Sequence, residues 1–177
     1  RMGNSSMAFT GAIFRGEQHL ISAEIVYVFA DPATQTSRPV PPALRQLITD
    51  FDAGQTVVDL RVGSWAELGA QARELRTAVF VNEQKIPLDI EMDAADDTAV
   101  HAVAVNRLGQ VVATGRLLAC QPGVAKIGRM AVHRILRGGH LGRQVLHALM
   151  DAARARGDRE VVLHAQRSAE GFYRRLG

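Results

Sequence analysis

The sequence feature that most constrains this chain is a basic, glycine-rich loop between an apolar run and a periodic helix. The apolar run covers residues 124–133, the loop follows it, and the helical pattern covers residues 141–156. Glycines let a backbone approach a ligand closely, and the first N–H groups of a helix favour phosphate. Arg137 and Arg143 add guanidinium groups that phosphate oxygens can accept in bidentate fashion. The segment therefore predicts a strand–loop–helix site for a phosphate-bearing ligand.

Three kinds of phosphate ligand are open at this point. A dinucleotide loop requires Gly-x-Gly-x-x-Gly, whereas Gly138 and Gly139 are adjacent here and Gly142 follows. Glu160 stands at about the distance of a ribose-binding acid, but it begins a strand instead of ending one. A nucleoside-triphosphate loop requires Gly-Lys-Ser/Thr, which the sequence lacks. The third candidate is the pyrophosphate of coenzyme A.

From residue 56 onward the apolar pattern alternates between strand and helix. A capping box, Ser64 to Glu67, opens a predicted helix over residues 64–80, in which apolar side chains repeat at helical spacing. An acidic connection over residues 82–98 follows it. The other predicted elements are strands over 56–62, 100–106, 111–119, 124–133 and 160–165, and helices over 141–156 and 168–176. This order predicts an α+β fold, a mixed β-sheet flanked by helices.

The first third of the chain has a different character. Residues 7–14 and 20–29 predict two strands joined by a short polar connection, and residues 43–51 predict a short helix. Four prolines between residues 31 and 42 exclude a helix or a central strand there. Two strands and one helix bury too little apolar surface to fold alone. We therefore predict two parts, residues 1–54 and 55–177.

Composition excludes several classes of protein. Of the 177 residues, 47% are hydrophobic and 22% are charged, which excludes wholesale disorder. Uninterrupted apolar stretches stay well short of the roughly 20 residues of a membrane helix, and no secretory signal peptide is visible. Cys120 is a lone cysteine, which excludes an internal disulfide and suits a cytoplasmic protein. We expect it to be a small buried side chain.

The charge distribution favours an anionic small ligand over nucleic acid. The 21 basic and 18 acidic residues give a net charge of only +3. Basic residues concentrate after residue 125, acidic residues crowd the stretch 89–97, and aromatic residues are not interleaved with the basic ones. A nucleic-acid surface would gather positive charge with stacking platforms on one face. We therefore expect neither a nucleic-acid nor a membrane partner.

Four motifs resemble those of the GNAT acyltransferase superfamily. The run Arg137-Gly138-x-x-Leu141-Gly142 resembles its Arg/Gln-x-x-Gly-x-Gly/Ala loop, and residues 127–132 resemble the strand before it. The end of the chain, 169–177, is similar to the family's Ala-x-x-Phe-Tyr ending, and 79–87 resembles the Val-Phe-Val-x-Glu-Gln-x-x-Pro stretch of its ElaA-like branch. The resemblance covers residues 56–177. His140 replaces the first loop glycine, and members usually add one or two further strands, which we expect to be missing here.

The first 52 residues resemble the last two strands and the tail of a hotdog-fold acyl-CoA thioesterase. Residues 5–9 and 26–31 carry that likeness. The resemblance implies a two-strand-plus-helix hotdog remnant, left from a thioesterase–acetyltransferase fusion. Its unpaired strand edges would invite pairing, so a homo-oligomer is possible.

The GNAT resemblance implies direct attack of an amine on the thioester of acetyl-CoA in a ternary complex. Tyr173 matches the family's tyrosine that protonates the departing thiolate. Backbone N–H groups around Met130 and Val132 would bond the pantetheine and polarise the thioester carbonyl. The full set of implied cofactor-binding residues is Met130, Ala131, Val132, Arg137, Gly138, Gly139, His140, Leu141, Gly142, Arg143 and Gln166.

The general base is less constrained. Glu83 is the first choice because it lies in the stretch that resembles the family's substrate-side loop; the alternatives are Asp93, Asp97, His101 and His133. The acidic run 91–97 is expected to be a solvated loop. No spacing indicates a metal site. Two other functions stay open, a thioesterase activity of a longer parent protein and a non-catalytic CoA-binding module, and the acceptor amine is undefined.

Overall fold

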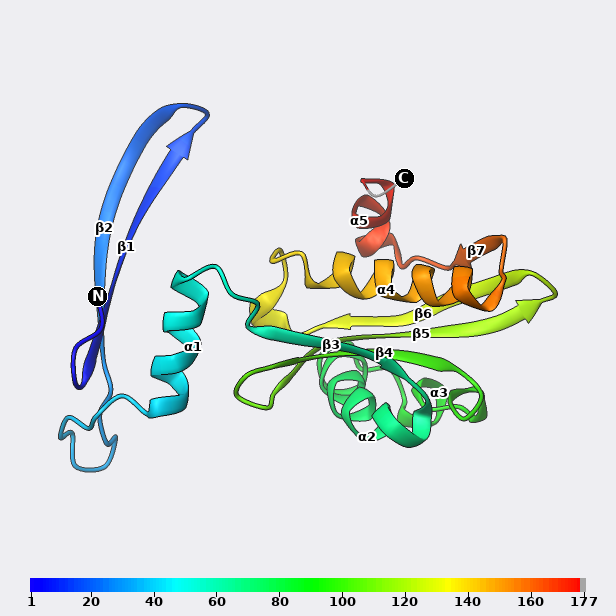
Figure 1. Cartoon of the computed structure of the whole chain (residues 1–177), viewed down its shortest axis with the longest axis horizontal. Coiled ribbons are helices and arrows are strands. Elements are labelled where there is room, and N and C mark those ends of the chain that lie inside the picture. The colour runs from blue at the N-terminus through cyan, green and yellow to red at the C-terminus, as the bar shows by residue number, and fades with distance from the viewer. Residues whose placement is uncertain (176–177) are drawn as a thin grey trace. The chain divides into compact units, whose positions relative to one another are not determined.

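The computed structural model describes residues 1–175 of the chain, which divides into two compact units. The N-terminal unit is Arg1–Val57, and the C-terminal unit begins at Val58. Figure 1 traces both units along the chain, from blue at the N-terminus to red.

The N-terminal unit is an antiparallel hairpin followed by one helix. Strands β1 (Ser6–Arg15) and β2 (Gln18–Val28) pair in a two-stranded sheet, and helix α1 (Pro42–Asp52) follows the proline-rich segment. Gly16 in the turn has a φ of 60°, a conformation that glycine adopts without steric cost. The predicted hairpin and helix are therefore confirmed.

The C-terminal unit contains a five-stranded mixed sheet. Its strands are β3 (Val58–Gly63), β4 (Val100–Asn106), β5 (Val111–Gln121), β6 (Val124–Val132) and β7 (Glu160–Leu163), and they lie side by side in that order. Neighbours from β3 to β6 are antiparallel, whereas β6 and β7 are parallel. A parallel pair requires a crossover, which helix α4 (Leu141–Arg156) supplies. The predicted α+β fold is confirmed.

Helices cover both faces of this sheet (Figure 1). Helix α4 packs on one face, and α2 (Trp65–Arg76) packs on the other. The predicted apolar stripe of the first helix is buried against the sheet, and its members are Leu68, Ala72, Leu75 and Val79. On the other face, α4 buries Leu141, Val145, Leu146, Leu149 and Ala153.

The structure corrects some predicted boundaries. The first helix of this unit ends at Arg76 and continues as a π-helix, Thr77–Glu83, instead of running as one α-helix to residue 80. Short helical turns follow at α3 (Leu88–Glu91), Ala94–Asp96 and Arg134–Leu136. The last predicted helix is a 3₁₀ turn, Arg167–Ala169, and a short helix α5, Glu170–Arg174; its predicted end at Leu176 lies outside the described residues.

Cys120 is also placed differently from the expectation. It is exposed near the end of β5, where the sheet extends past its helical cover, so it is not a buried side chain. Near Cys120 the apolar and polar residues of strand 111–121 do not alternate clearly, so the sequence does not show where the strand becomes exposed.

Candidate active site

The site begins where the parallel strands β6 and β7 separate. Their register runs from Val124 opposite Glu160 to Ile127 opposite Leu163, and β7 ends there while β6 continues. Just beyond this point β6 contains a bulge against β5, and Arg129 has a left-handed φ of 51°. A bulge bends its strand and changes the direction of the next peptide groups. The end of β6 therefore has an edge that β7 does not cover.

Peptide groups of β6 face this uncovered edge. The His133 N–H donates to the Val112 carbonyl at 2.9 Å, so the opposed residues Val132 and Ala113 form a non-hydrogen-bonded pair. In such a pair the N–H and C=O point away from the partner strand. The Val132 carbonyl accordingly accepts the Arg137 Nε–H at 3.2 Å.

Gly115 faces the bulge from β5 and leaves room for it. A Cβ at this position would come within 2.6 Å of the Met130 sulfur and within 2.8–2.9 Å of Leu149 and Val145 on α4. Such contacts are shorter than any packed core tolerates. The glycine therefore determines how closely β5, the bulge and α4 approach.

A first cavity of about 640 Å³ lies over the glycine-rich loop and the start of α4. Its shape depends on left-handed backbone at Gly138, with φ 89°, and at His140, with φ 66°. A Cβ at Gly142 would lie 3.4 Å from both Phe172 and Val132, so this glycine brings α4 close to the end of β6. The lining residues are Met130, Val132, Leu136, Arg137, Gly138, His140, Leu141, Gly142, Arg143, Ala169, Phe172, Tyr173 and Arg175.

A second cavity of about 410 Å³ lies on the other side of the β6 edge. It is lined by side chains of the π-helix, the bulge and the segment after β7, among them Phe80, Gln84, Ile86, Glu91, Arg129, His164 and Gln166. Five residues line both cavities, namely Met130, Val132, Arg137, Ala169 and Tyr173. Nearly all the predicted cofactor-binding residues thus lie on these two cavities, and Ala131 and Gln166 lie on the second; Gly139 lines neither.

Tyr173 lies where the two cavities meet. Its side chain is half-buried and packs edge-to-face on Phe172, with ring centroids 4.9 Å apart. Burial raises the pKa of the phenol above its usual range. The side chain therefore stays protonated and can donate a proton over a wide range of pH.

The structure brings Glu83 and Arg137 into a direct ion pair. Arg137 donates Nη1–H to Oε1 at 2.7 Å and Nη2–H to Oε2 at 2.8 Å, and its third nitrogen is engaged with Val132. The hydrogen bonds from Arg137 lower the pKa of Glu83. Glu83 lines neither cavity. Gln166 lies nearby and donates to Gln84 Oε1 at 3.0 Å.

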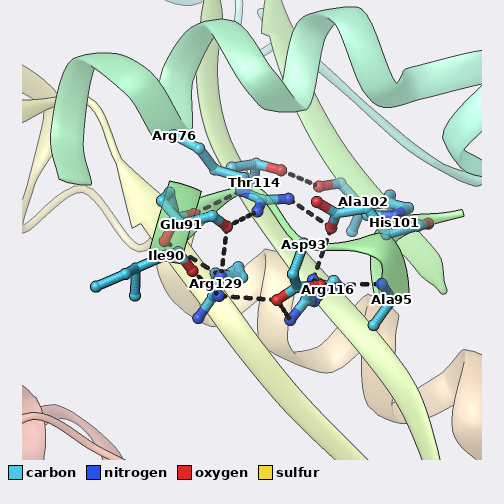
Figure 2. A network of polar contacts seen from close by, with 11 residues as sticks. Arg76, Ile90, Glu91, Asp93, Ala95, His101, Ala102, Thr114, Arg116 and Arg129 are labelled. Carbon is cyan, nitrogen blue, oxygen red and sulfur yellow. Dashed lines mark hydrogen bonds and ion pairs between the residues drawn. The ribbon is translucent and has the colours of Figure 1, made fainter. Parts of the chain in front are cut away.

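A network of buried and partly buried ion pairs lies next to the bulge at Arg129 (Figure 2). Arg76, 1% exposed, donates to Glu91 Oε1 and Asp96 Oδ1, each at 2.7 Å. Arg116 donates to Asp93 at 2.7 Å and to Asp96 at 2.8 Å. Removing a guanidinium from water costs free energy, and close hydrogen bonds to two carboxylates offset that cost. The network fixes α3 and the turn after it against β5.

Arg129 connects this network to the second cavity. Its guanidinium donates to the carbonyls of Ile90 and Glu91 at 3.0 and 3.1 Å and to Asp93 Oδ2 at 3.0 Å (Figure 2). These bonds hold a residue whose backbone conformation costs about 1–2 kcal/mol outside glycine. Glu91 is 2% exposed; burial raises its pKa, and this effect outweighs the opposing effect of Arg76.

The network overturns the expectation that the acidic run 91–97 is a solvated loop. Glu91 and Asp96 are buried in ion pairs, and hydrogen bonds from Arg116 lower the pKa of Asp93. His101, one of the alternative bases, is fully buried; its Nε2–H donates to the Asp96 carbonyl at 3.0 Å, and burial lowers its pKa. It has no access to either cavity, nor do Asp93, Asp97 and His133 line one.

Two further searches cover the described residues. Within residues 1–175, no group of three or more His, Cys, Asp or Glu side chains is arranged to hold a metal ion. No helix in the same range is long and apolar enough to cross a membrane.

In this unit the parallel strands β6 and β7 diverge beside the glycine-rich start of α4, and two cavities adjoin there. This arrangement is typical of an acyltransferase domain. The model of the Acetyltransferase (GNAT) family matches residues 69–177. The chain therefore belongs to the GNAT acetyltransferase family. The match begins at residue 69, so the resemblance of the first unit to a hotdog thioesterase stays a prediction.

Known proteins agree with this assignment. The uncharacterized N-acetyltransferase YjcF of Bacillus subtilis is 31% identical over 103 residues, which are 58% of this chain and 72% of that protein. An acyl-CoA N-acyltransferase from Pseudomonas aeruginosa is 33% identical, with a TM-score of 0.59 over 68% of this chain and 87% of that one. ElaA of Escherichia coli is 27% identical, with a TM-score of 0.60 over 68% and 86%.

Sequence reasoning missed several residues of the site. The bulge at Arg129 and the buried ion pairs of Arg76 and Arg116 join segments far apart in the chain, so no local pattern indicates them. His164 lines the second cavity without belonging to a quoted motif, and Arg175 lines the first although it was not predicted as a site residue. The only available signal for His164 was its position directly after a predicted strand.

Proposed function

We propose that this protein transfers an acetyl group from acetyl-CoA to a primary amine in a ternary complex. As a member of the GNAT family, it is an acetyltransferase, and acetyl-CoA is the family's cosubstrate. The observation that carries the mechanism is the junction of two cavities at Met130, Val132 and Tyr173, along the uncovered edge of β6.

The first cavity fits the cofactor. The Val132 N–H points to the uncovered edge, where an amide carbonyl of the pantetheine arm can accept it, and the absence of a side chain at Gly142 opens the start of α4. Pyrophosphate would lie against the loop 138–142, where N–H groups begin the helix. Arg143 and Arg175 line the same cavity and add positive charge, and Arg137 lines it with its guanidinium paired to Glu83.

The second cavity is then the acceptor side. Its volume is in the range of small-molecule sites, and apolar side chains from the π-helix form one wall. The amine nitrogen would attack the thioester carbon from this side, while the Met130 N–H stabilises the oxyanion. As the C–N bond forms and the C–S bond breaks, Tyr173 gives its proton to the thiolate.

Replacement of Tyr173 by Phe tests this assignment. The expected result is a loss of about 100-fold or more in kcat, because the leaving thiolate then departs unprotonated. The dissociation constant of CoA, measured by calorimetry, should change less than about threefold. The assay measures free CoA thiol released with a panel of phenylethylamine, glucosamine, spermidine and a lysine tetrapeptide.

The pH profile gives a second readout of the same role. Burial raises the pKa of Tyr173, and the acid must be protonated to act, so wild-type kcat should stay level above the range in which a free phenol ionises. Unchanged turnover in Y173F would remove Tyr173 from the mechanism. Thiol release that requires no amine would instead indicate a thioesterase.

A further inference from the structure

The acceptor-side cavity contains an imidazole that the mechanism above does not use. His164 directly follows β7, at the point where β7 has stopped pairing with β6. Its side chain is exposed and lines the same cavity as Tyr173 and Gln166. It therefore lies on the side from which the amine must approach, and Tyr173 lies on the boundary with the cofactor side.

An attacking amine must lose a proton, and the other groups on this cavity are poorly suited to take it. Among the described lining residues, the ionisable side chains besides His164 are Glu91, Arg129, Arg137 and Tyr173. Arginine does not deprotonate in proteins, and Tyr173 is the proton donor of the proposed reaction.

Glu91 is buried, and both of its carboxylate oxygens are occupied. Oε1 accepts the Arg76 Nε–H at 2.7 Å, and Oε2 lies 3.2 Å from Arg129 Nε. Burial raises the pKa of Glu91, but a proton on it would disrupt its pairing with the buried Arg76 and the partly buried Arg129. Its two oxygens therefore serve to hold the wall of the cavity.

Glu83 is excluded on different grounds. Arg137 holds both of its oxygens, its pKa is lowered by those bonds, and it does not line the acceptor cavity. Its geometry suits a positioning residue that fixes Arg137, which lines both cavities. The role of base predicted for Glu83 from the sequence stays a prediction, and this geometry does not favour it.

We propose that His164 is the general base that takes the proton from the acceptor amine; this inference rests on the proposed acetyl transfer. An imidazole nitrogen accepts one proton from the ammonium group, and the freed amine attacks the thioester carbon. The C–N bond forms, the C–S bond breaks, and the thiolate takes the Tyr173 proton. The acylated nitrogen loses its second proton to solvent and becomes the amide nitrogen. The imidazolium returns its proton to solvent, and the Tyr173 phenolate is reprotonated from solvent. Histidine is the side chain that most often acts as a general base.

The test compares H164Q with two matched variants. H147Q removes an exposed histidine on α4 that lines neither cavity, and E83Q removes the competing carboxylate. For each protein the measurements are melting temperature, CoA affinity by calorimetry, and kcat/KM from pH 5 to 9 with the best alkyl amine of the panel.

We expect H164Q to lose about 100-fold or more in kcat/KM and to lose the pH dependence that a histidine base imposes between about pH 5 and 8. Its CoA affinity and melting temperature should match those of H147Q, and E83Q should keep the wild-type pH profile. Near-wild-type kcat/KM in H164Q, or a loss of that pH dependence in E83Q, overturns the assignment. If wild-type protein binds acetyl-CoA but turns over no amine, the proposed function fails, and the assignment of His164 fails with it.

Discussion

The two units contain similar apolar strands, yet only one of them buries these side chains. In the hairpin, one face consists of the cross-strand pairs Met7–Tyr27, Phe9–Ile25 and Ile13–Ile21, and Ile13 is 60% exposed. In the C-terminal unit, Ile127 of β6 is 1% exposed because α4 lies over that face. The comparison shows that an apolar strand predicts a core only where another layer covers it.

The C-terminal unit also contains a network of buried ion pairs. Arg76, Glu91 and Asp96 are each at most 3% exposed, whereas the ion pair Arg1–Glu24 of the hairpin lies at the surface. Burial makes each of the first three groups dependent on its partners, because an unpaired charge in the interior is costly. The same type of interaction therefore contributes differently in the two units.

The largest expected effect comes from Arg76. The substitution Arg76→Ala leaves Glu91 and Asp96 without their shared partner and should lower the free energy of unfolding by about 3–5 kcal/mol. Chemical denaturation followed by tryptophan fluorescence measures this, since Trp65 packs on the Arg76 guanidinium at 5.6 Å. The matched control is Arg73→Ala: Arg73 is exposed, lies 5.7 Å from the same ring, and should contribute less than about 1 kcal/mol. Equal losses in both variants would contradict a special role for the buried network.

An intermediate effect is expected at Gly115. A methyl group there would enter the space of the Met130 sulfur, Val145 and Leu149, so Gly115→Ala should cost about 1–3 kcal/mol through overpacking. Because Met130 lines both cavities, CoA affinity should fall as well. Gly11→Ala in the hairpin is the control, since a Cβ there meets nothing within 4 Å. An unchanged CoA affinity in Gly115→Ala would show that the bulge does not determine the cofactor site.

The smallest effect tests burial directly. Ile127→Val removes one buried methylene and should cost about 0.5–1.5 kcal/mol, whereas Ile13→Val at the exposed hairpin face should change the main unfolding transition by less than about 0.3 kcal/mol. Both positions lie on strands, so β-propensity changes little in either case. If Ile13→Val costs as much as Ile127→Val, the hairpin face is covered in solution.

Much of the fold follows from local patterns. The periodicity of residues 141–156 defined helix α4, the capping box at Ser64 marked the start of α2, and the apolar run in residues 100–106 defined β4. Each pattern is local because backbone hydrogen bonds and one-sided burial act over a few residues. The glycine-rich loop could also be predicted from the sequence, because glycine favours left-handed backbone and particular residue types mark the start of a helix.

The residues proposed for proton transfer were harder to predict from the sequence. Glu83 was predicted as the base from its place in a motif, yet the fold pairs it with Arg137, 54 residues away in the chain. His164 gave no signal beyond its place after a strand, and it lines the second cavity just past the last paired residues of β6 and β7.

The sequence by itself determined most elements of this protein, the glycine-rich loop before α4 and the family to which these motifs belong. The tertiary structure alone decided which charges are buried, which ion pairs form across 15 to 54 residues, and which side chains line each cavity. Local propensity depends on neighbouring residues, whereas burial and pKa depend on what the fold packs against a group from distant segments. For that reason Glu91, expected in a solvated run, is buried beside Arg76, and the exposed His164 lines the second cavity.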